Sequence, residues 1–247
     1  MQGDQAHLFL HYSQTLEKDS SRVDISGQEH HHLRRVLRSV RGDTVFVTNG
    51  RGVMVRGDVE SIDDVKTVIN VTEVVQQRTS TVPLTLALAC LKKDAFEQAV
   101  KQCTELGMTR CLPFVAARSH LKEYSDTYLD RLRKIALSAM KQSFRSVLPS
   151  MDNVVAFDTV LHEAPEHRVT VVGAAGAPPL DPPHAGHPLL VVVGPEAGLT
   201  TDEVGRLEAA GCVLRSVSLH RLRSETAAAA LTGALLQPVD HGRDDSV

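Results

Sequence analysis

The segment Leu189–Val204, LLVVVGPEAGLTTDEV, joins an apolar strand to a polar turn and a helix start. A Gly-Pro pair stops the strand, Glu196 places a charge at its tip, and Thr200 and Glu203 have the spacing of a capping box. Helix starts carry unpaired backbone N–H groups, and ligands favour the carboxyl ends of buried strands. The segment therefore predicts a site for a polar small molecule. The plain alternative is a turn that needs glycine and proline only for its shape.

A second charged segment, Arg221–Ala230 with the sequence RLRSETAAAA, stands at the start of another predicted helix. Glu225 suits the positive N-terminal end of a helix, but arginines do not. Arg221 and Arg223 are therefore expected to contact another group, either an anionic substrate or Glu196. The alternative is a solvated helix end with an alanine run that reflects only helix propensity. Together the two segments predict a small-molecule site at the carboxyl edge of an α/β sheet.

Histidines and arginines follow one another closely in a predicted helix near the start of the chain. Adjacent residues on a helix point in different directions, so a metal site is not expected at His30–His32. The arginines recur at helical spacing and could hold phosphate groups, although an ordinary charged helix face would have the same pattern. These arginines are Arg34, Arg35, Arg38 and Arg41.

Two further polar segments carry weaker signals. Gln142, Ser143 and Arg145 follow a predicted helix, and taken alone they would be a polar helix end. Gly173–Gly176 follows a strand, but it lacks the G-x-G-x-x-G order, and two prolines come where a helix would be needed. A dinucleotide site is therefore not predicted.

The composition is that of a soluble globular protein. The chain has 247 residues, 42% of them apolar and 23% charged, with a net charge of −3. Aromatic residues make up only 4% and tryptophan is absent, so stacking of bases on an aromatic platform is not expected. Any polyanion must then meet a local basic patch. Four scattered cysteines without a C-x-x-C pair, no signal peptide and no membrane span predict a cytoplasmic location.

Two regions with different hydrophobic periods must position these segments. Residues 1–75 are expected to form a small barrel with one helix, Glu29–Val40, in which Leu33, Val36, Leu37 and Val40 recur at helical spacing. The polar residues Gln76–Thr81 are a predicted linker. The strands expected in the first region are His7–Leu10, Arg22–Ile25, Thr44–Thr48, Val53–Val59 and Val68–Val75.

From Val82 onward, strands alternate with helices, which predicts a largely parallel sheet covered on both faces. The expected helices include Asp94–Leu106, capped by Gly107, and Tyr128–Gln142. The polar C-terminal residues, Pro238–Val247, are expected to be frayed. The expected strands are Leu84–Leu91, Cys111–Val115, Val169–Gly173 and Leu189–Val193.

Five segments resemble the RsmE family of 16S ribosomal RNA uridine-N3 methyltransferases, which belong to the SPOUT superfamily. The segments have the order and spacing of that family, and the resemblance spans nearly the whole chain. They are HHLRRVLRSVRGD at 31–43, KQCTELG at 101–107, AMKQSFR at 139–145, VVVGPEAGLTTDEV at 191–204 and RLRSETAA at 221–228. Five motifs in register are far more specific than any one of them.

The resemblance implies a PUA-like β-barrel over residues 1–75 that helps to grip RNA. It implies an α/β SPOUT methyltransferase domain over residues 76–247, with a C-terminal trefoil knot. The implied cofactor is S-adenosylmethionine, and the implied substrate is 16S ribosomal RNA or the assembled small ribosomal subunit. Family members are homodimers with the active site close to the subunit boundary. Neither a metal nor a membrane is implied.

The family's G-P-E-G-G loop matches Gly194–Gly198, but Ala197 replaces its middle glycine. The added methyl group could narrow the pocket or exclude a left-handed backbone. Phe144 stands where glycine or leucine is common. A further family segment matches residues 217–223 without a gap, whereas an alternative match puts Leu219 on the family's leucine with two residues missing. The cofactor-binding residues that the resemblance implies are Gly194, Pro195, Glu196, Ala197, Gly198, Val217, Ser218, Leu219 and Leu222.

For catalysis, Arg223 is the expected stabiliser of the charge that develops on the uridine. Glu225 or Glu196 could orient this arginine or act as the base. Two alternatives stay open: another SPOUT enzyme that methylates ribose or transfer RNA, and an RNA-binding protein that has lost catalysis. The residues expected to contact RNA are His31, His32, Arg34, Arg38, Gln142, Arg145 and Arg221.

Overall fold

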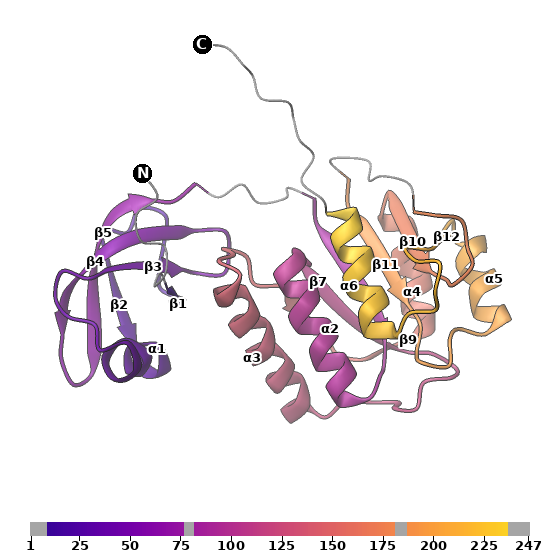
Figure 1. Cartoon of the computed structure of the whole chain (residues 1–247), viewed down its shortest axis with the longest axis horizontal. Helices are drawn as coiled ribbons and strands as arrows, with labels where there is room; N and C mark the ends of the chain where they lie inside the picture. Colours follow the sequence, from indigo (N-terminus) through magenta and orange to yellow (C-terminus); the bar gives the residue numbers. More distant parts are fainter. Residues whose placement is uncertain (1–8, 77–81, 181–186, 237–247) are drawn as a thin grey trace, which may run out of the picture. The chain divides into compact units, whose positions relative to one another are not determined.

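Short apolar strands form a parallel sheet in the larger part of the chain (Figure 1). The computed structural model describes residues 9–76, 82–180 and 187–236. Within them the strand order is β12-β10-β11-β6-β7-β8, with β9 beside β7, and all these pairs are parallel, as predicted. The strands are β6 (Leu84–Ala89), β7 (Arg110–Val115), β8 (Ser150–Met151), β9 (Val155–Ala156), β10 (Val169–Gly173), β11 (Leu189–Val193) and β12 (Val213–Arg215).

Helices cover both faces of this sheet, which confirms the expected layers. On one face α2 (Lys93–Leu106) and α6 (Ser224–Leu235) lie side by side, and α6 contacts β6, β10 and β11. On the other face lie α4 (Phe157–Glu163), which contacts β7, and α5 (Thr201–Ala209), which contacts β12. A single 3₁₀ turn, η2 (Ala164–Glu166), follows α4.

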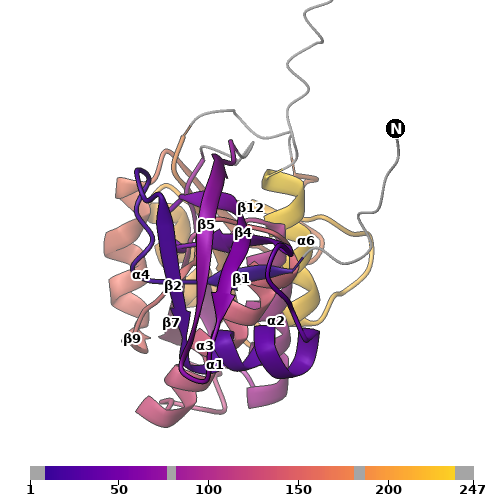
Figure 2. The same ribbon diagram turned by 90° about the vertical axis from the view of Figure 1, so that its left-hand side faces the viewer.

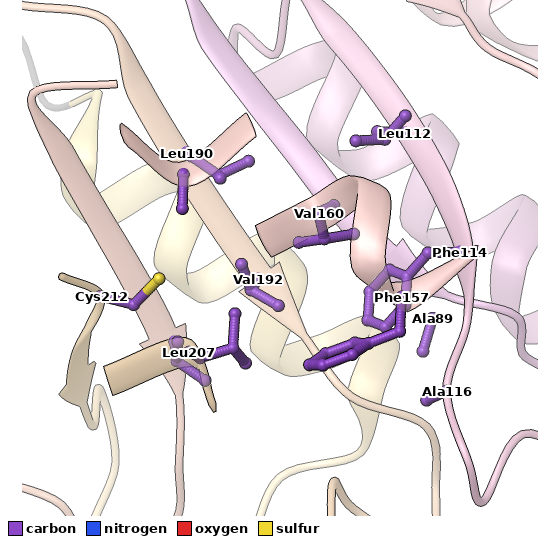
Figure 3. Packing of buried hydrophobic residues seen from close by; sticks show 13 residues of the cluster. Ala89, Leu112, Phe114, Ala116, Phe157, Val160, Leu190, Val192, Leu207 and Cys212 are labelled. Atoms are coloured by element: carbon purple, nitrogen blue, oxygen red, sulfur yellow. The ribbon is translucent and has the colours of Figure 1, made fainter. Parts of the chain in front are cut away.

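The core beneath α4 and α5 is built from small and medium apolar side chains (Figure 3). Phe157 and Val160 of α4 and Leu207 of α5 are buried against strand residues such as Val192. The ring centroids of Phe157 and Phe114 are 6.0 Å apart. Burial of these side chains holds the two helices against the sheet through the hydrophobic effect.

The chain divides into two units, and the first is discontinuous in sequence. It combines the residues before position 80 with Leu137–Leu148. The second combines Ser80–Ala136 with the residues from Pro149 onward. Helix α3 (Asp126–Gln142) therefore begins in the second unit and ends in the first. The domain boundary predicted from the sequence, between residues 75 and 76, places Leu137–Leu148 in the second region, whereas in the structure they belong to the first unit.

A curled sheet in the order β1-β3-β4-β5-β2 forms the first unit (Figure 2). Strand β1 is parallel to β3, and the other neighbouring pairs are antiparallel. In the described residues β1 and β2 are not paired with each other, so the expected barrel is a half-barrel. The strands are β1 (Leu10–Tyr12), β2 (Arg22–Ser26), β3 (Thr44–Thr48), β4 (Met54–Ile62) and β5 (Lys66–Val74).

The helix expected at Glu29–Val40 is shorter than its hydrophobic period suggests. The structure has α1 (Gly27–His31), followed by a π-helical turn, η1 (His32–Leu37). Arg38 then ends the helix in a left-handed conformation with φ of 55°. A π turn has a wider repeat than an α-helix, so residues after it leave the face that 3.6-residue spacing predicts.

This early helix end changes the predicted faces. Val36 and Val40 are exposed, although the spacing placed them with the buried Leu33. Arg41 lies beyond the helix, so it does not share one helical face with Arg34 and Arg38.

Most other predicted elements are confirmed to within a few residues at each end. The short elements β8, β9, β12, α4 and η2 were not predicted. Three predictions fall wholly or partly outside the described residues: the linker after Gln76, the first residues of the strand His7–Leu10, and the C-terminal residues Pro238–Val247.

A charged cluster inside the first unit joins α1 to the end of α3. Glu29 Oε1 accepts a hydrogen bond from Lys141 Nζ at 2.5 Å, and Glu29 Oε2 lies 3.3 Å from His11 Nδ1. Burial alone would raise the pKa of Glu29, but the hydrogen bonds and positive charges of His11 and Lys141 lower it to about 2. The cluster therefore stabilises the folded first unit only while Glu29 is ionised.

We expect Glu29→Gln to lower the free energy of unfolding at pH 7 by up to about 3 kcal/mol, the value of the pKa shift. Because the folded pKa lies below the usual 4.5, this contribution is complete above pH 4.5 and is lost as the pH falls toward 2. Urea unfolding followed by circular dichroism at pH 7 and pH 3 measures it.

The matched control is Glu17→Gln, because Glu17 forms an exposed ion pair with Arg51 in the same unit. Exposed pairs contribute little, so this variant should unfold almost like the unchanged protein. An equal loss of stability at pH 7 and pH 3 for Glu29→Gln would contradict the assignment.

Candidate functional site

A cavity of about 920 Å³ opens in the second unit at the carboxyl ends of β10, β11 and β12. Its lining comes mainly from three segments that are far apart in sequence: 172–175, 193–199 without Ala197, and 215–225 without Leu219. Volumes of this order are typical of small-molecule sites. The two segments that the sequence singled out, 194–198 and 217–223, thus share one cavity.

The turn that follows β11 needs glycine at two positions. A Cβ on Gly194 would lie 2.9 Å from Leu199 Cγ, closer than side-chain packing permits. Gly198 has a left-handed φ of +75°, and its N–H donates to Pro195 O at 2.7 Å. Both glycines are therefore required by the shape of the turn.

Ala197 does not disturb this turn. Among the described residues, the only non-glycine residues with a positive φ are Arg38 and Phe144, so the backbone of Ala197 is not left-handed. Its side chain is exposed and does not line the cavity. The alanine therefore neither strains the backbone nor narrows the cavity, which removes both consequences considered from the sequence.

The predicted capping box is confirmed at the start of α5. Glu203 N donates to Thr200 Oγ1 at 3.2 Å, and Glu203 Oε2 accepts from Thr200 N at 2.7 Å. The Glu203 side chain is buried, and its other oxygen accepts from Ala117 N at 2.7 Å. The cap thus also connects α5 to the turn after β7, which the sequence did not indicate.

The charged residues of the second segment lie where the sequence placed them, at the cavity. Arg221, Arg223 and Glu225 all line it, with Glu225 buried in the first turn of α6. Arg221 Nη2 donates to the backbone oxygen of Glu196 at 3.2 Å. The sequence anticipated a contact with Glu196, but the acceptor is the main chain and not the carboxylate.

The carboxylate of Glu196 has a different neighbour. Its Oε1 accepts a hydrogen bond from Lys92 N at 3.3 Å, and Lys92 is the N-cap residue of α2. A carboxylate is favourable at a helix N-terminus because of the helix dipole. Glu196 therefore joins the turn after β11 to the start of α2.

The segment 216–220 is shaped by its own hydroxyl groups. Ser216 Oγ donates to Ser218 O at 2.7 Å, and Ser218 Oγ accepts from His220 N at 3.0 Å. Val217, Ser218 and Leu222 line the cavity, whereas Leu219 is fully exposed and does not. Leu219 therefore does not share the cavity with the other residues of this segment that were expected to bind the cofactor.

Some cavity residues escaped the sequence analysis. Gly173 had been considered only for a dinucleotide site, yet a Cβ there would lie 2.8 Å from Leu231 Cδ1, and Ala174 and Ala175 also line the cavity. The same rule that selected 194–198, the carboxyl end of a buried strand, could have found this segment. Lys92 and His120 line the cavity too, and no motif marks them in the sequence.

Ser224 stands within the predicted segment 221–230 but is not among the residues expected to bind a ligand. It is buried at the start of α6, and its Oγ donates to Gly194 O at 2.9 Å. This bond and the one from Arg221 connect the two predicted segments directly. A serine at a helix start is so common that its sequence context gave no reason to select it.

Four residues expected to contact RNA lie on or near η1 in the first unit. His31 and Arg38 are exposed, and Arg34 forms an ion pair with Asp64 at 2.5 Å. Burial, together with the positive charges of His11 and Lys141, lowers the pKa of His32. His32 is therefore neutral near pH 7 and suits a hydrogen bond better than an ion pair with phosphate.

The remaining two residues of the first unit follow one another closely at the end of α3. Gln142 is exposed, and Arg145 is half-buried, where burial lowers the pKa of its guanidinium group. Between them Phe144 has a left-handed φ of 56°, and its ring packs edge-on against Phe46 with centroids 5.4 Å apart. Arg221, the last residue expected to contact RNA, lies on the cavity in the second unit.

In residues 9–76, 82–180 and 187–236, no group of three or more histidines, cysteines, aspartates or glutamates could hold a metal ion. His30 is buried, and its Nδ1 lies 2.9 Å from Thr67 Oγ1. No helix in that part of the chain is long and apolar enough to span a membrane.

Comparison with known proteins gives consistent matches. Residues 78–236 match the family described as RNA methyltransferase domain. The ribosomal RNA small subunit methyltransferase E of Bacillus subtilis is 28% identical over 233 residues, which cover 89% of this chain and 91% of that protein. The protein of the same name from Synechocystis is 31% identical over 225 residues, covering 87% of this chain and 74% of the relative.

A solved structure has the same fold. The ribosomal RNA small subunit methyltransferase E of Neisseria gonorrhoeae, determined with bound S-adenosylmethionine, superimposes with a TM-score of 0.84. The match covers 92% of this chain and 96% of that one, at 22% identity. The family match extends over more than half of the chain, and the relatives span most of it. The chain therefore belongs to the RsmE family of RNA methyltransferases.

Proposed function

We propose that this protein transfers a methyl group from S-adenosylmethionine to N3 of one uridine in 16S ribosomal RNA. The observation that carries the proposal is the cavity that the 194–199 turn and the 215–225 segment share, in a chain of this family. The relatives named above are methyltransferases of small-subunit ribosomal RNA. The choice of uridine N3 depends on the resemblance of the segment at 31–43 to the RsmE family.

The cavity suits S-adenosylmethionine in size and in the chemistry of its walls. Val172, Val193 and Leu231 offer apolar surface to a nucleoside, and backbone groups surround them at the strand ends. When bound, the cofactor supplies a methyl group on a positively charged sulfur, whose bond to that methyl breaks as the bond to N3 forms. The residues that would hold it are Gly194, Pro195, Glu196, Gly198, Val217, Ser218 and Leu222.

Arg223 is the residue we assign to stabilisation of the reacting base. Uridine N3 carries a proton that must leave, and the resulting negative charge spreads over N3 and the two flanking carbonyl oxygens. Arg223 lines the cavity as the N-cap residue of α6, so its guanidinium group can donate hydrogen bonds to such oxygens. Placement of the base beside the methyl group supplies the rest of the rate enhancement.

Two carboxylates are available for the N3 proton or for orienting Arg223. Glu196 already accepts the Lys92 N–H at the start of α2. Glu225 is buried on the cavity two residues after Arg223. We therefore propose that Glu225 either orients Arg223 or accepts the N3 proton. Glu196 instead helps to maintain the shape of the turn.

RNA binding is assigned to both units. His31, His32, Arg34 and Arg38 would contact RNA from the PUA-like half-barrel, with Gln142 and Arg145 at the end of α3. Arg221 would contact it at the cavity. A uridine in folded RNA has to leave its stack to reach the methyl group, as bases do in other nucleic-acid-modifying enzymes.

Three further features belong to this proposal. The chain returns from the edge strand β12 to α6, which packs on the central strands β6 and β11, and this path supports the trefoil knot of SPOUT enzymes. A homodimer with the active site near the subunit boundary follows from the family, as does a cytoplasmic location beside the ribosomal RNA.

Mass spectrometry of nucleosides tests the reaction directly. Small-subunit RNA from a strain without this gene should lack one 3-methyluridine, and the purified protein with S-adenosylmethionine should restore it. Free 16S RNA and assembled small subunits, compared as substrates, identify the one that is used. Loss of a ribose-methylated nucleoside, or of a modified nucleoside in transfer RNA, would instead favour another SPOUT activity.

Arg223→Ala should keep the affinity for S-adenosylmethionine and lower the methylation rate by about 10²–10³-fold, the usual effect of removing one stabiliser of transition-state charge. Calorimetry measures binding, and single-turnover methylation measures the rate. Arg206→Ala is the control, because Arg206 pairs with Asp158 away from the cavity. Full activity of Arg223→Ala would remove this residue from the mechanism.

Gly198→Ala should raise the Kd for S-adenosylmethionine by about tenfold, because a left-handed alanine costs roughly 1–2 kcal/mol. Ala197→Gly restores the family's usual residue, yet it should change the Kd by less than about twofold, since Ala197 is neither left-handed nor on the cavity. Calorimetry on both variants checks the pair. If Ala197→Gly binds S-adenosylmethionine more tightly than the unchanged protein does, the alanine impairs the site. If the unchanged protein does not bind S-adenosylmethionine at all, the alternative of an RNA-binding protein that has lost catalysis is favoured.

A further inference from the structure

Arg118 joins the turn after β7 to the turn after β11. Its Nη1 donates to Ala197 O at 3.2 Å and to Leu199 O at 3.4 Å. Two other side chains donate to carbonyl groups of this turn, Arg221 to Glu196 O and Ser224 to Gly194 O, and both belong to the 221–224 segment. Side chains on two sides of the 194–199 turn thus engage its carbonyl groups.

Because these side chains engage carbonyl groups, the groups of the turn that can still form further hydrogen bonds are mainly its N–H groups. Pro195 O already accepts from Gly198 N within the turn. In the part of the chain that the structure describes, the N–H groups of Glu196, Ala197 and Leu199 have no protein acceptor. Donors therefore engage the carbonyl groups of Gly194, Pro195, Glu196, Ala197 and Leu199, and these bonds restrict the orientation of the turn.

The segment that carries Arg118 is itself held firmly. Ser119 is buried, its Oγ accepts from Ala116 N at 3.1 Å, and its N–H donates to Ala116 O at 3.1 Å. Lys122 Nζ donates to the same carbonyl at 3.2 Å. The neighbouring residue also reaches α5, because Ala117 N donates to Glu203 Oε1 at 2.7 Å. Donors from Ala117 and Arg118 therefore connect this segment both to the 194–199 turn and to the start of α5.

We infer that Arg118 is a positioning residue that holds the 194–199 turn in the shape that binds S-adenosylmethionine. Arg118 does not line the cavity, so it acts through the turn and not by contact with the ligand. The inference rests on the proposed function for the identity of the ligand. The part that concerns the turn can be tested without any ligand.

The guanidinium group is suited to this role. Both bonds come from Nη1, whose N–H groups lie in the rigid plane of the guanidinium group, whereas the ammonium group of lysine is a compact charge on a flexible stem. Arg118 is also exposed, so its removal leaves no buried cavity. Arg118→Ala is therefore expected to fold, and Arg118→Lys should recover only part of the lost function.

Hydrogen exchange on the free protein tests the turn itself. In peptides covering residues 190–205, the amide hydrogens that are protected in the unchanged protein should exchange about tenfold faster in Arg118→Ala. This is the effect expected for the loss of one charge-assisted hydrogen bond. Arg133→Ala is the control, because Arg133 also donates to a backbone oxygen, Met151 O, but away from the cavity. Unchanged exchange in Arg118→Ala would overturn the inference.

Binding and rate measurements test the consequence. Arg118→Ala should raise the Kd for S-adenosylmethionine about tenfold. Its single-turnover rate at saturating cofactor should stay within about twofold, the opposite of the pattern expected for Arg223→Ala. Arg118→Lys should have an intermediate Kd. A general loss of structure would instead lower the melting temperature and reduce affinity and rate together, which would overturn the positioning role.

The two proposals can fail separately. If the unchanged protein binds no S-adenosylmethionine while Arg118→Ala still accelerates exchange, the proposed function is wrong and the role of Arg118 in the turn stands without that ligand. If the unchanged protein binds the cofactor and Arg118→Ala binds it equally well, the inference about Arg118 is wrong and the proposed function stands.

Discussion

A parallel strand that ends at a sheet edge must release the chain through a turn whose carbonyl groups still need hydrogen-bond donors. In this protein β11 ends beside two other strand ends, and the chain turns between Gly194 and Leu199 with no room for a side chain at the first position. The turn cannot satisfy its own carbonyls, because only Gly198 donates within it. Donors come instead from one residue, Arg118, which stands 79 and 81 positions before its two acceptors, and from Arg221 and Ser224, which stand 25 and 30 positions after theirs. The hydrogen bonds that the carbonyl groups of this one backbone segment accept thus bring the distant parts of the site together.

Much of this site could be predicted because its signals are local. A capping box, a Gly-Pro pair after a buried strand and charges at a helix start are each short-range patterns with a direct physical cause. The residues that were missed, such as Arg118, Ser224 and His120, act at a distance that no spacing in the sequence records. Their roles depend on which strand ends become neighbours. The order β10-β11-β6-β7 decides this, and periodicity cannot give that order.

The first unit was harder to predict, for a related reason. Its helix has apolar residues at regular spacing, but η1 widens the repeat and Arg38 adopts a left-handed backbone, so Val36 and Val40 are exposed. The polar contacts of Glu29 with His11 and Lys141 fix where α1 lies within the unit. Such contacts between residues 18 and 112 positions apart override a local hydrophobic pattern.

The discontinuous first unit has a consequence for the order in which the protein is made. Gly50 O accepts from Leu148 N at 2.8 Å, and Ser146 O accepts from Gly52 N at 2.8 Å. During translation these partners leave the ribosome about a hundred residues after β3 does, at roughly 5–20 residues per second. The half-barrel therefore lacks these backbone hydrogen bonds for several seconds, while the intervening strands and helices emerge. A chain cut after the first region would never receive those partners, so the native unit cannot be obtained by expressing residues 1–75 alone.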